Sequence, residues 1–243
     1  MKTLSDISTL PAKHASKSRS LKGLTALHKQ LFDLQNVFYA DGRYGLLIIL
    51  QGMDTSGKDG TVRHVMNCMN PAGLRVKSFK KPTEVEESHD FLWRIYPHIP
   101  ETSMIQVFNR SYYEDIIVPS VSNALTEDTL KHRCSLINEL EQHLMRNNIH
   151  VLKFFLHISK DEQEKRIKER LTMPNKRWKY SKEDEKAAQK WDAYMGIYDR
   201  LISQCNKIEW HIIPADKRWY RNFMVANVVT EHLQNLNLKY PNS

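Results

Sequence analysis

The sequence of 243 residues predicts an α/β fold in which helices cover both faces of a parallel sheet. Short apolar segments of strand length alternate along the chain with longer segments of helical periodicity, a pattern typical of parallel sheets. No internal repeat or low-complexity tract interrupts this alternation, which favours a single domain over residues 1–243. Eight glycines and nine prolines are too few for a fibrous or disordered chain.

The first helix and the first strand are predicted from periodicity and run length. After a polar leader over residues 1–20, apolar residues recur at helical spacing and predict a helix over Leu24–Ala40. Asp41-Gly42 ends that helix. The uninterrupted apolar run Gly45–Gln51 then predicts a strand buried on both faces.

Helix breakers divide the rest of the chain. Asn70-Pro71 ends a helix predicted over about Gly60–Met69, and Met173-Pro174-Asn175 separates two charged helices. Further strands are predicted at Leu74–Phe79, Ser103–Phe108, Val151–Ile158 and Trp210–Ile213. Further helices are predicted at Glu84–Tyr96, Glu127–Arg146, Asp161–Leu171, Lys182–Ser203 and Trp219–Leu236.

Several classes of protein are excluded by what the sequence lacks. The longest aliphatic run, Leu46–Leu50, is far shorter than the roughly 20 residues of a membrane helix, and the leader has no apolar stretch like that of a signal peptide. Cys68, Cys134 and Cys205 form no CxxC pair, and the histidines form no HExxH motif. We therefore expect a cytoplasmic protein without a disulfide framework, a zinc site or a membrane partner.

A phosphate-binding motif directly follows the first predicted strand. Gly52–Gly60 (GMDTSGKDG) fits the pattern G-x-x-x-x-G-K at a strand-to-helix junction. Glycines let successive backbone N–H groups and the helix N-terminus face an anion, and Lys58 supplies a mobile charge. A plain glycine turn is the alternative, but the lysine in register favours a phosphate site. The predicted phosphate- or nucleotide-binding residues here are Gly52, Thr55, Ser56, Gly57, Asp59, Gly60 and Arg63.

Two carboxylates depart from the usual motif. Asp59 stands where the hydroxyl that ligates magnesium is normally found, and Asp54 lies where a carboxylate would repel phosphates unless a cation intervened. We infer that Asp54 meets magnesium or orients the group under attack. Either aspartate could instead cap the helix that follows.

A second polar segment follows the third predicted strand. Asn109 stands where phosphotransferases of this architecture usually have a magnesium-binding Asp, and a carboxylate recurs at Glu114. Arg110 could clamp a phosphate with both guanidinium nitrogens. Tyr113 could stack on a base or fill the core.

Most of the net charge of +8 lies in one segment. Lys165–Lys182 holds eight basic residues against Glu169, and Pro174 breaks it into two arms. Such a segment is typical of a mobile lid that closes over phosphates and excludes water, although a solvated helix face is the alternative. We place the lid at about residues 161–190. Its predicted phosphate contacts are Arg166, Arg170, Lys176, Arg177 and Lys179.

Four segments of the chain resemble the polyphosphate kinase 2 family, in the same order and at similar distances. They are GMDTSGKDGTVRHVM, FNRSYYED, MPNKRWKYS followed by WDAYM, and ADKRWY. The resemblance extends from about Leu24 to Leu236 and implies a three-layer, thymidylate-kinase-like P-loop fold with a helical basic lid. It implies reversible phosphoryl transfer between inorganic polyphosphate and AMP, ADP or ATP, with Mg²⁺ or alternatively Mn²⁺, in a homodimer or homotetramer.

The resemblance also implies roles for individual residues. Asp54 and Lys58 match essential loop residues of the family, Arg110 and the lid match its phosphate contacts, and Asn109 with Glu114 resembles class III, whose members phosphorylate both AMP and ADP. We expect Asp54 and Glu114 to hold the metal, with Lys80 or Lys81 at the entry of the polyphosphate chain. Guanine nucleotides are possible further substrates, and no nucleic-acid partner is expected.

Two other functions use the same features. An ATP-dependent nucleoside monophosphate kinase needs the same loop, but the Ser or Thr expected after Lys58 is missing. A nucleic-acid binder could use the basic segment, with Trp178 and Tyr180 stacking on bases.

Overall fold

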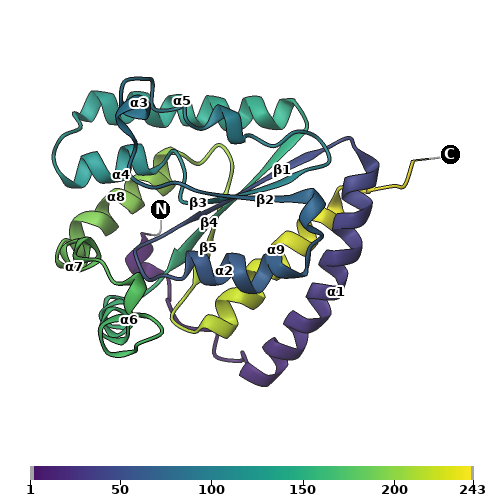
Figure 1. Ribbon diagram of the computed structural model, residues 1–243, viewed down its shortest axis with the longest axis horizontal. Coiled ribbons are helices and arrows are strands. Elements are labelled where there is room, and N and C mark those ends of the chain that lie inside the picture. The colour runs from purple at the N-terminus through teal and green to yellow at the C-terminus, as the bar shows by residue number, and fades with distance from the viewer. Residues whose placement is uncertain (1–2, 242–243) are drawn as a thin grey trace.

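The computed structural model describes residues 3–241, without the side chains of residues 179 and 182–184. Within this range one sheet has the strand order β2-β3-β1-β4-β5, and all its neighbouring strands are parallel (Figure 1). The strands are β1 (Gly45–Gln51), β2 (Leu74–Ser78), β3 (Ile105–Asn109), β4 (Ile149–His157) and β5 (Trp210–Pro214). The predicted α/β class with a parallel sheet is confirmed.

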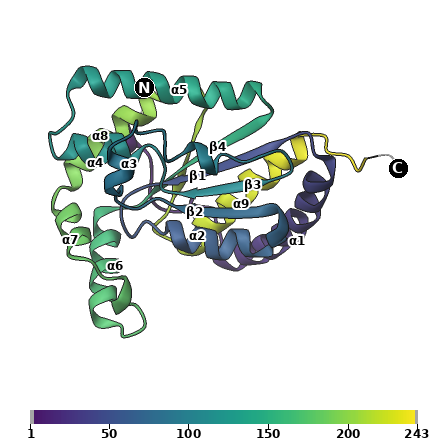
Figure 2. The ribbon, with the colours of Figure 1, turned by 45° about the horizontal axis from the view of Figure 1, so that its top comes forward.

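Helices cover both faces of this sheet, as Figures 1 and 2 show. One face carries α1 (Lys17–Asp41), α2 (Lys58–Val65) and α9 (Arg218–Asn235). The other carries α4 (Glu114–Val121), α5 (Glu127–Arg146) and α8 (Trp191–Gln204). Beyond the carboxyl ends of the strands lie α3 (Glu84–Glu87), α6 (Lys160–Thr172) and α7 (Lys182–Gln189). Short 3₁₀ helices span Leu4–Asp6, Met66–Cys68, Pro71–Gly73, Tyr96–His98 and Arg177–Lys179.

The central strand β1 explains why the apolar pattern predicted the sheet so directly. Every residue of β1 is buried, because β3 and β4 flank it and helices cover both its faces. A strand in this position needs an uninterrupted apolar run rather than alternation. None of the described helices combines the length and the apolar character needed to cross a membrane.

The register of the strands brings the two predicted site segments together. Leu50 of β1 pairs with Asn109 of β3, and the backbone N–H of Arg110 donates to the Leu50 carbonyl at 3.1 Å. The chain leaving β1 and the chain leaving β3 therefore start side by side at the carboxyl edge of the sheet. Ligands of open parallel sheets bind at this edge.

The helix predicted over Glu84–Tyr96 is wrong beyond its first turn. Helix α3 ends at Glu87, and the chain then turns because the Asp90 carboxylate accepts from the Leu92 N–H at 2.9 Å. This local bond offers the backbone an alternative to the helix. Pro97, which cannot donate in a helix interior, lies in the short 3₁₀ turn that follows.

Other boundaries also differ from the predictions, and α1 begins at Lys17, inside the predicted polar leader. The helix predicted over Lys182–Ser203 is divided at Lys190, since α7 packs against α6 whereas α8 packs against α4 and α5. Helix α4 was not predicted, and it contains Pro119. The polar leader is also partly structured, because Leu4 is buried and its N–H donates to the Asp199 carboxylate at 2.6 Å.

Candidate active site

Two adjoining cavities open at the carboxyl edge of the sheet. The smaller has a volume of about 470 Å³ and is lined by the phosphate loop and the start of α2. The larger has a volume of about 1340 Å³ and is lined by α4, α7 and α8. Both cavities are lined by Asp54, Phe79, Lys80, Lys81, Arg110 and Trp178. The two motif segments thus meet where the cavities join.

The phosphate loop has the backbone that its glycines predict. Gly52, Thr55 and Gly57 all have positive φ (141°, 65° and 106°), and Gly57 is the N-cap of α2. Glycine adopts these angles without a steric cost, and a non-glycine residue such as Thr55 stores strain of the kind found at functional sites. The loop therefore curls so that the N-terminus of α2 faces the smaller cavity.

The side chain of Lys58 is held inside the phosphate loop by backbone carbonyls of that loop. Its Nζ donates to the carbonyls of Gly52 at 2.7 Å and Met53 at 3.2 Å, and the side chain is buried. Burial and then the charge of Arg110 lower the pKa of Lys58. The ammonium group is thus a buried donor with carbonyl partners that a stronger acceptor such as a phosphate oxygen can replace.

Arg110 lies between two acidic residues of the site, Asp54 and Glu114. Its Nη2 donates to Asp54 Oδ1 at 2.6 Å, and its Nη1 lies 4.0 Å from Glu114 Oε2. Burial would raise the pKa of Asp54, but the charges of Lys58 and Arg110 outweigh it and hold that pKa low. Burial raises the pKa of Glu114. Arg110 itself has a φ of 64°, so its backbone is strained like that of Thr55.

Asn109 and Asp59 form a hydrogen bond across the mouth of the loop. The Asn109 amide donates to Asp59 Oδ1 at 2.8 Å. Asp59 is the second residue of α2, and the N-cap position belongs to Gly57. The alternative that Asp54 or Asp59 caps this helix is therefore wrong.

The structure brings most of the predicted site residues to the two cavities. Those lining a cavity are Gly52, Asp54, Thr55, Gly57, Lys58, Asp59, Gly60, Lys80, Lys81, Asn109, Arg110, Glu114 and Arg170. Arg63 is exposed and Ser56, within the loop, is buried, and neither residue lines a cavity. In the lid, Lys176 pairs with Glu169 at 2.7 Å and Arg177 is exposed. The side chain of Lys179 lies outside the described part.

Tyr113 belongs to the core, so the alternative that it stacks on the base of a nucleotide is wrong. Its ring has no exposed surface, and its hydroxyl donates to Glu141 Oε1 at 2.7 Å. The hydroxyl also accepts from Lys153 at 3.2 Å. A buried tyrosine needs such a partner for its hydroxyl, and the core supplies it here.

Arg166 braces the phosphate loop from behind instead of contacting phosphates from the lid. Its guanidinium is buried and donates to the carbonyls of Thr55, at 2.9 Å, and Ser56, at 3.2 Å. The same group donates to the carbonyls of Ala215 and Asp216, each at 2.9 Å. Arg166 and Arg170 share a face of α6, but Arg170 alone of the two lines a cavity.

Residues that the sequence analysis did not select also line the larger cavity. Tyr194 and Tyr198 lie on successive turns of α8, and Ile117 and Val118 lie on α4. The spacing of the two tyrosines predicts a shared helix face but does not say whether that face meets the core or a cavity. The reason is visible in the fold, because α7 and α8 return to the sheet edge from far along the chain (Figure 2).

Comparison with known proteins agrees with this geometry. The family model described as Polyphosphate kinase 2 (PPK2) matches residues 14–241. An AMP/ADP-polyphosphate phosphotransferase of Meiothermus ruber is 42% identical over 93% of this chain and 85% of its own. An ADP-polyphosphate phosphotransferase of Rhodopseudomonas palustris is 40% identical over 88% of this chain and 78% of its own.

A solved structure extends the likeness to three dimensions. The crystal structure of polyphosphate kinase 2 from Arthrobacter aurescens TC1 has a TM-score of 0.96 and 37% identity, over 100% of this chain and 88% of that one. The match confirms the expected P-loop kinase fold. The chain is thus an enzyme of the phosphotransferase type and belongs to the polyphosphate kinase 2 family.

Proposed function

We propose that this enzyme transfers the terminal phosphoryl group of inorganic polyphosphate to both AMP and ADP, reversibly and with Mg²⁺. The observation that carries the proposal is the pair of adjoining cavities, which differ in character and meet at Asp54 and Arg110. In-line transfer requires a donor and an acceptor phosphate on opposite sides of the transferred group. Two cavities that share one charged junction offer that arrangement.

The smaller cavity suits a chain of phosphates. Its cationic lining residues are Lys58, Lys80, Lys81, Arg110 and Arg170, against the carboxylates of Asp54 and Asp59. Polyphosphate carries charge but no base, so cations and backbone N–H groups can recognise all of it. Lys80 and Lys81 are exposed at the opening, where they would guide the incoming chain.

The larger cavity suits a nucleoside. It combines apolar and aromatic side chains, including Ile117, Val118, Tyr194 and Trp178, with the charged junction and with further cations at Arg94, Lys186 and Lys190. A nucleotide has both kinds of surface, since the two ring faces of its base are largely apolar and its phosphates are anionic. We therefore place AMP or ADP here, with its terminal phosphate toward Arg110.

The donor set at the junction fits Mg²⁺. Among the described residues no group of three or more His, Cys, Asp or Glu is arranged to hold a metal. Mg²⁺ commonly uses one or two carboxylates together with water and substrate phosphates, so Asp54 and Glu114 would suffice, and Mn²⁺ takes similar ligands. The low pKa of Asp54 keeps it anionic for this role. The metal would neutralise charge between the two substrates.

The protein's own residues would position the phosphates and stabilise negative charge. Lys58 would exchange its carbonyl partners for a phosphate oxygen, and Arg110 would follow the phosphoryl group as it passes between the cavities. The lid residues Arg170, Lys176 and Arg177 would cover the polyphosphate run and exclude water. Little covalent chemistry is required of the protein.

The test is direct. The purified protein is incubated with MgCl₂, long-chain polyphosphate and either AMP or ADP, and the nucleotides are separated by chromatography. Conversion of AMP to ADP and then to ATP is the expected result. Phosphorylation of ADP alone would contradict the use of AMP, and ATP serving as donor while polyphosphate is inert would favour an ordinary monophosphate kinase.

The homo-oligomer, the use of guanine nucleotides and the cytoplasmic location stay predictions. Light scattering coupled to size-exclusion chromatography would distinguish a dimer or tetramer from a monomer. The same chromatographic assay with GMP and GDP would test the use of guanine nucleotides.

A further inference from the structure

A second buried arginine, Arg221 of α9, lies directly behind the phosphate loop. Its side chain is 2% exposed, and its Nη1 donates to the Ser56 carbonyl at 3.1 Å. Its Nε and Nη2 donate to Asn222 Oδ1 at 3.2 and 2.8 Å. The guanidinium also lies against two loop glycines: a Cβ on Gly57 would stand 1.7 Å from Nη1, and one on Gly60 would stand 3.0 Å from Nη2.

The loop backbone lies between Arg221 and the smaller cavity, since Gly57 and Gly60 contact the guanidinium and also line that cavity. The carbonyl of Ser56 accepts from both Arg166 and Arg221. In a trans peptide the N–H of the next residue points opposite to the carbonyl. The two arginines thus turn the Gly57 N–H away from themselves, and N–H groups so oriented form anion-binding sites.

Arg221 lacks the counter-ion that a buried charge normally has. Over the described residues no carboxylate pairs with it, whereas Arg166 donates to Glu162 at 2.9 Å. Burial, followed by the charges of Arg166 and Arg218, lowers the pKa of Arg221 to about 9, so it stays cationic at neutral pH. A buried cation without an anion is destabilising, and an anion nearby would relieve that cost.

We propose that Arg221 is a positioning residue whose missing counter-ion is the phosphate chain bound on the other side of the loop. The guanidinium acts through the Ser56–Gly57 peptide: it orients the N–H toward the anion and adds positive potential across one layer of backbone. The inference rests on the proposed assignment of the loop to phosphate. The unpaired charge of Arg221 would make the ligand-free protein less stable than the protein with phosphate bound.

The probe is inorganic tripolyphosphate, whose affinity is measured by isothermal titration calorimetry on the full chain. Arg221→Gln removes the charge but keeps a donor near Ser56, and we expect binding about tenfold weaker or more. Arg221→Lys keeps the charge and should recover most of the affinity. A tenfold loss also removes about 1.4 kcal/mol of the stabilisation that saturating tripolyphosphate gives against unfolding.

Asn222→Asp is the sharper variant, because it adds one charge at nearly constant shape. The new carboxylate would accept from the same two nitrogens of Arg221 and supply its counter-ion internally. We expect the ligand-free protein to unfold at higher urea concentration while tripolyphosphate binding weakens about tenfold. A purely structural Arg221 would give the stabilisation without the loss of affinity, and this result would overturn the proposal.

Two controls separate this inference from the assignment of the loop. Arg146→Gln removes an exposed arginine at the end of α5, beside the opposite edge of the sheet, and should leave affinity unchanged. Lys58→Ala should weaken binding; if it does not, the loop is not the phosphate site. If Lys58→Ala weakens binding and neither Arg221→Gln nor Asn222→Asp does, the loop assignment stands and the role of Arg221 is wrong.

Discussion

The core and the phosphate site both bury cations, but they neutralise them differently. In the core, Lys153 donates to Glu141 at 2.7 Å and to the Cys205 carbonyl at 2.8 Å, and both charged side chains are fully buried. Tyr112 and Tyr113 donate to the same carboxylate. Behind the loop, Arg221 has carbonyl and amide partners and, within residues 3–241, no paired carboxylate.

This contrast indicates what each cation does. A buried charge that is paired internally is matched by the fold itself and needs nothing from solvent. A buried cation whose hydrogen-bond partners are all neutral gains most when an anion arrives from outside. Lys58, whose Nζ donates to two loop carbonyls, resembles Arg221 in this respect. We expect changes in the core to act on stability and changes at the loop to act on substrate.

The largest effect is expected from breaking the core pair. Glu141→Gln keeps the shape and an acceptor but leaves Lys153 charged without an anion, and it should lower the free energy of unfolding by about 3–5 kcal/mol. Urea denaturation followed by circular dichroism measures this. The double variant Glu141→Gln with Lys153→Met removes both charges but keeps an acceptor for the hydroxyls of Tyr112 and Tyr113, so it should recover most of the loss. A single variant as stable as the wild type would contradict the contrast between core and site.

The reverse pattern is expected at Lys58. Lys58→Ala removes a donor that would stabilise negative charge in transfer, and kcat should fall by about 10²- to 10³-fold, or about 3–4 kcal/mol. Stability should not fall, because burial already lowers the pKa of this group and opposes its charge. Coupled assays of ATP formation from ADP, alongside urea denaturation, measure both quantities. Near-normal turnover would sink the assignment of Lys58.

The sequence predicted the parts of the site that are close along the chain. The strand Gly45–Gln51, the loop that follows it and the start of α2 are contiguous, so an apolar run and two glycines with a lysine were sufficient. Asn109 and Arg110 could be added because residues that follow neighbouring parallel strands meet at one edge.

What the sequence could not predict depends on partners far along the chain. Arg166 was assigned to the lid because its neighbours are basic, yet it binds loop carbonyls 110 and 111 residues away. Arg221 binds Ser56 across 165 residues, and Tyr113 is in the core because Glu141 and Lys153 pair with its hydroxyl there. No local pattern distinguishes a lysine or arginine that faces solvent from one that turns inward.

A third test concerns the choice of nucleotide at the junction of the cavities. Exchanging the pair, with Asn109→Asp and Glu114→Asn, moves the buried carboxylate from α4 to the end of β3 and places it beside Asp59. We expect kcat/KM with AMP to fall about tenfold more than kcat/KM with ADP, as the likeness to class III implies; one tenfold step is about 1.4 kcal/mol. Equal losses with both nucleotides would show that the pair does not set this preference.

The smallest effect is expected from buried histidines beside β4, which differ from both the paired Lys153 and the unpaired Arg221. The rings of His150 and His232 lie 5.0 Å apart, and the ring of His150 lies 5.3 Å from that of Tyr44. Burial, followed by the charges that His150 and His211 would carry, lowers the pKa of His232 to about 4. Burial likewise lowers the pKa of His150 and of His211. Here the fold keeps the group neutral instead of pairing it.

The lowered pKa of His232 predicts that the protein loses stability as the pH falls. A histidine whose pKa is near 6.5 when unfolded and about 4 when folded binds its proton more readily in the unfolded state. Stability is therefore complete above pH 6.5 and falls as the pH drops toward 4. With allowance for the partial exposure of the ring, His232 should contribute about 1 kcal/mol of this loss between about pH 7 and 5.

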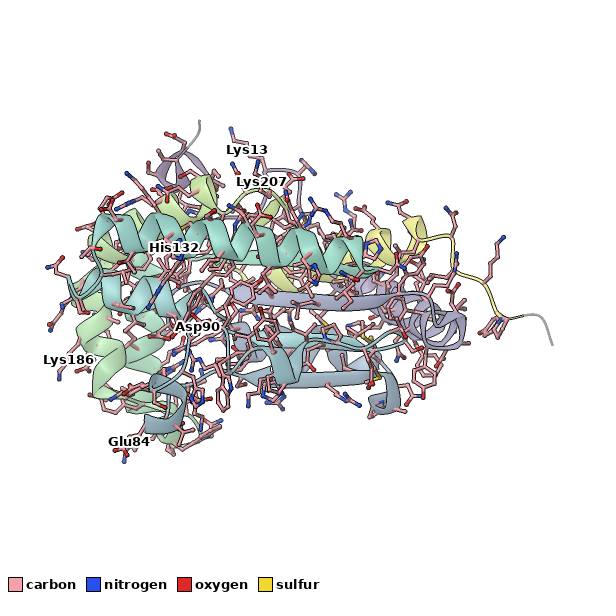
Figure 3. The ribbon with its side chains drawn as sticks, turned by 90° about the horizontal axis from the view of Figure 1, so that it is seen from above. Lys13, Glu84, Asp90, His132, Lys186 and Lys207 are labelled. Carbon is pink, nitrogen blue, oxygen red and sulfur yellow. The ribbon has the colours of Figure 1, made fainter. Side chains whose placement is uncertain are left out.

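His232→Phe should flatten that part of the pH profile, because phenylalanine can keep the edge contact with His150 but takes up no proton. The free energy of unfolding in urea, measured at half-unit steps from about pH 7 to about pH 5, gives the slope for each protein. His132→Phe, on the exposed face of α5 (Figure 3), is the matched control and should leave the slope unchanged. If both variants kept the wild-type slope, the acid sensitivity would arise elsewhere. The contrast between the paired charge of Lys153 and the neutral ring of His232 would then fail.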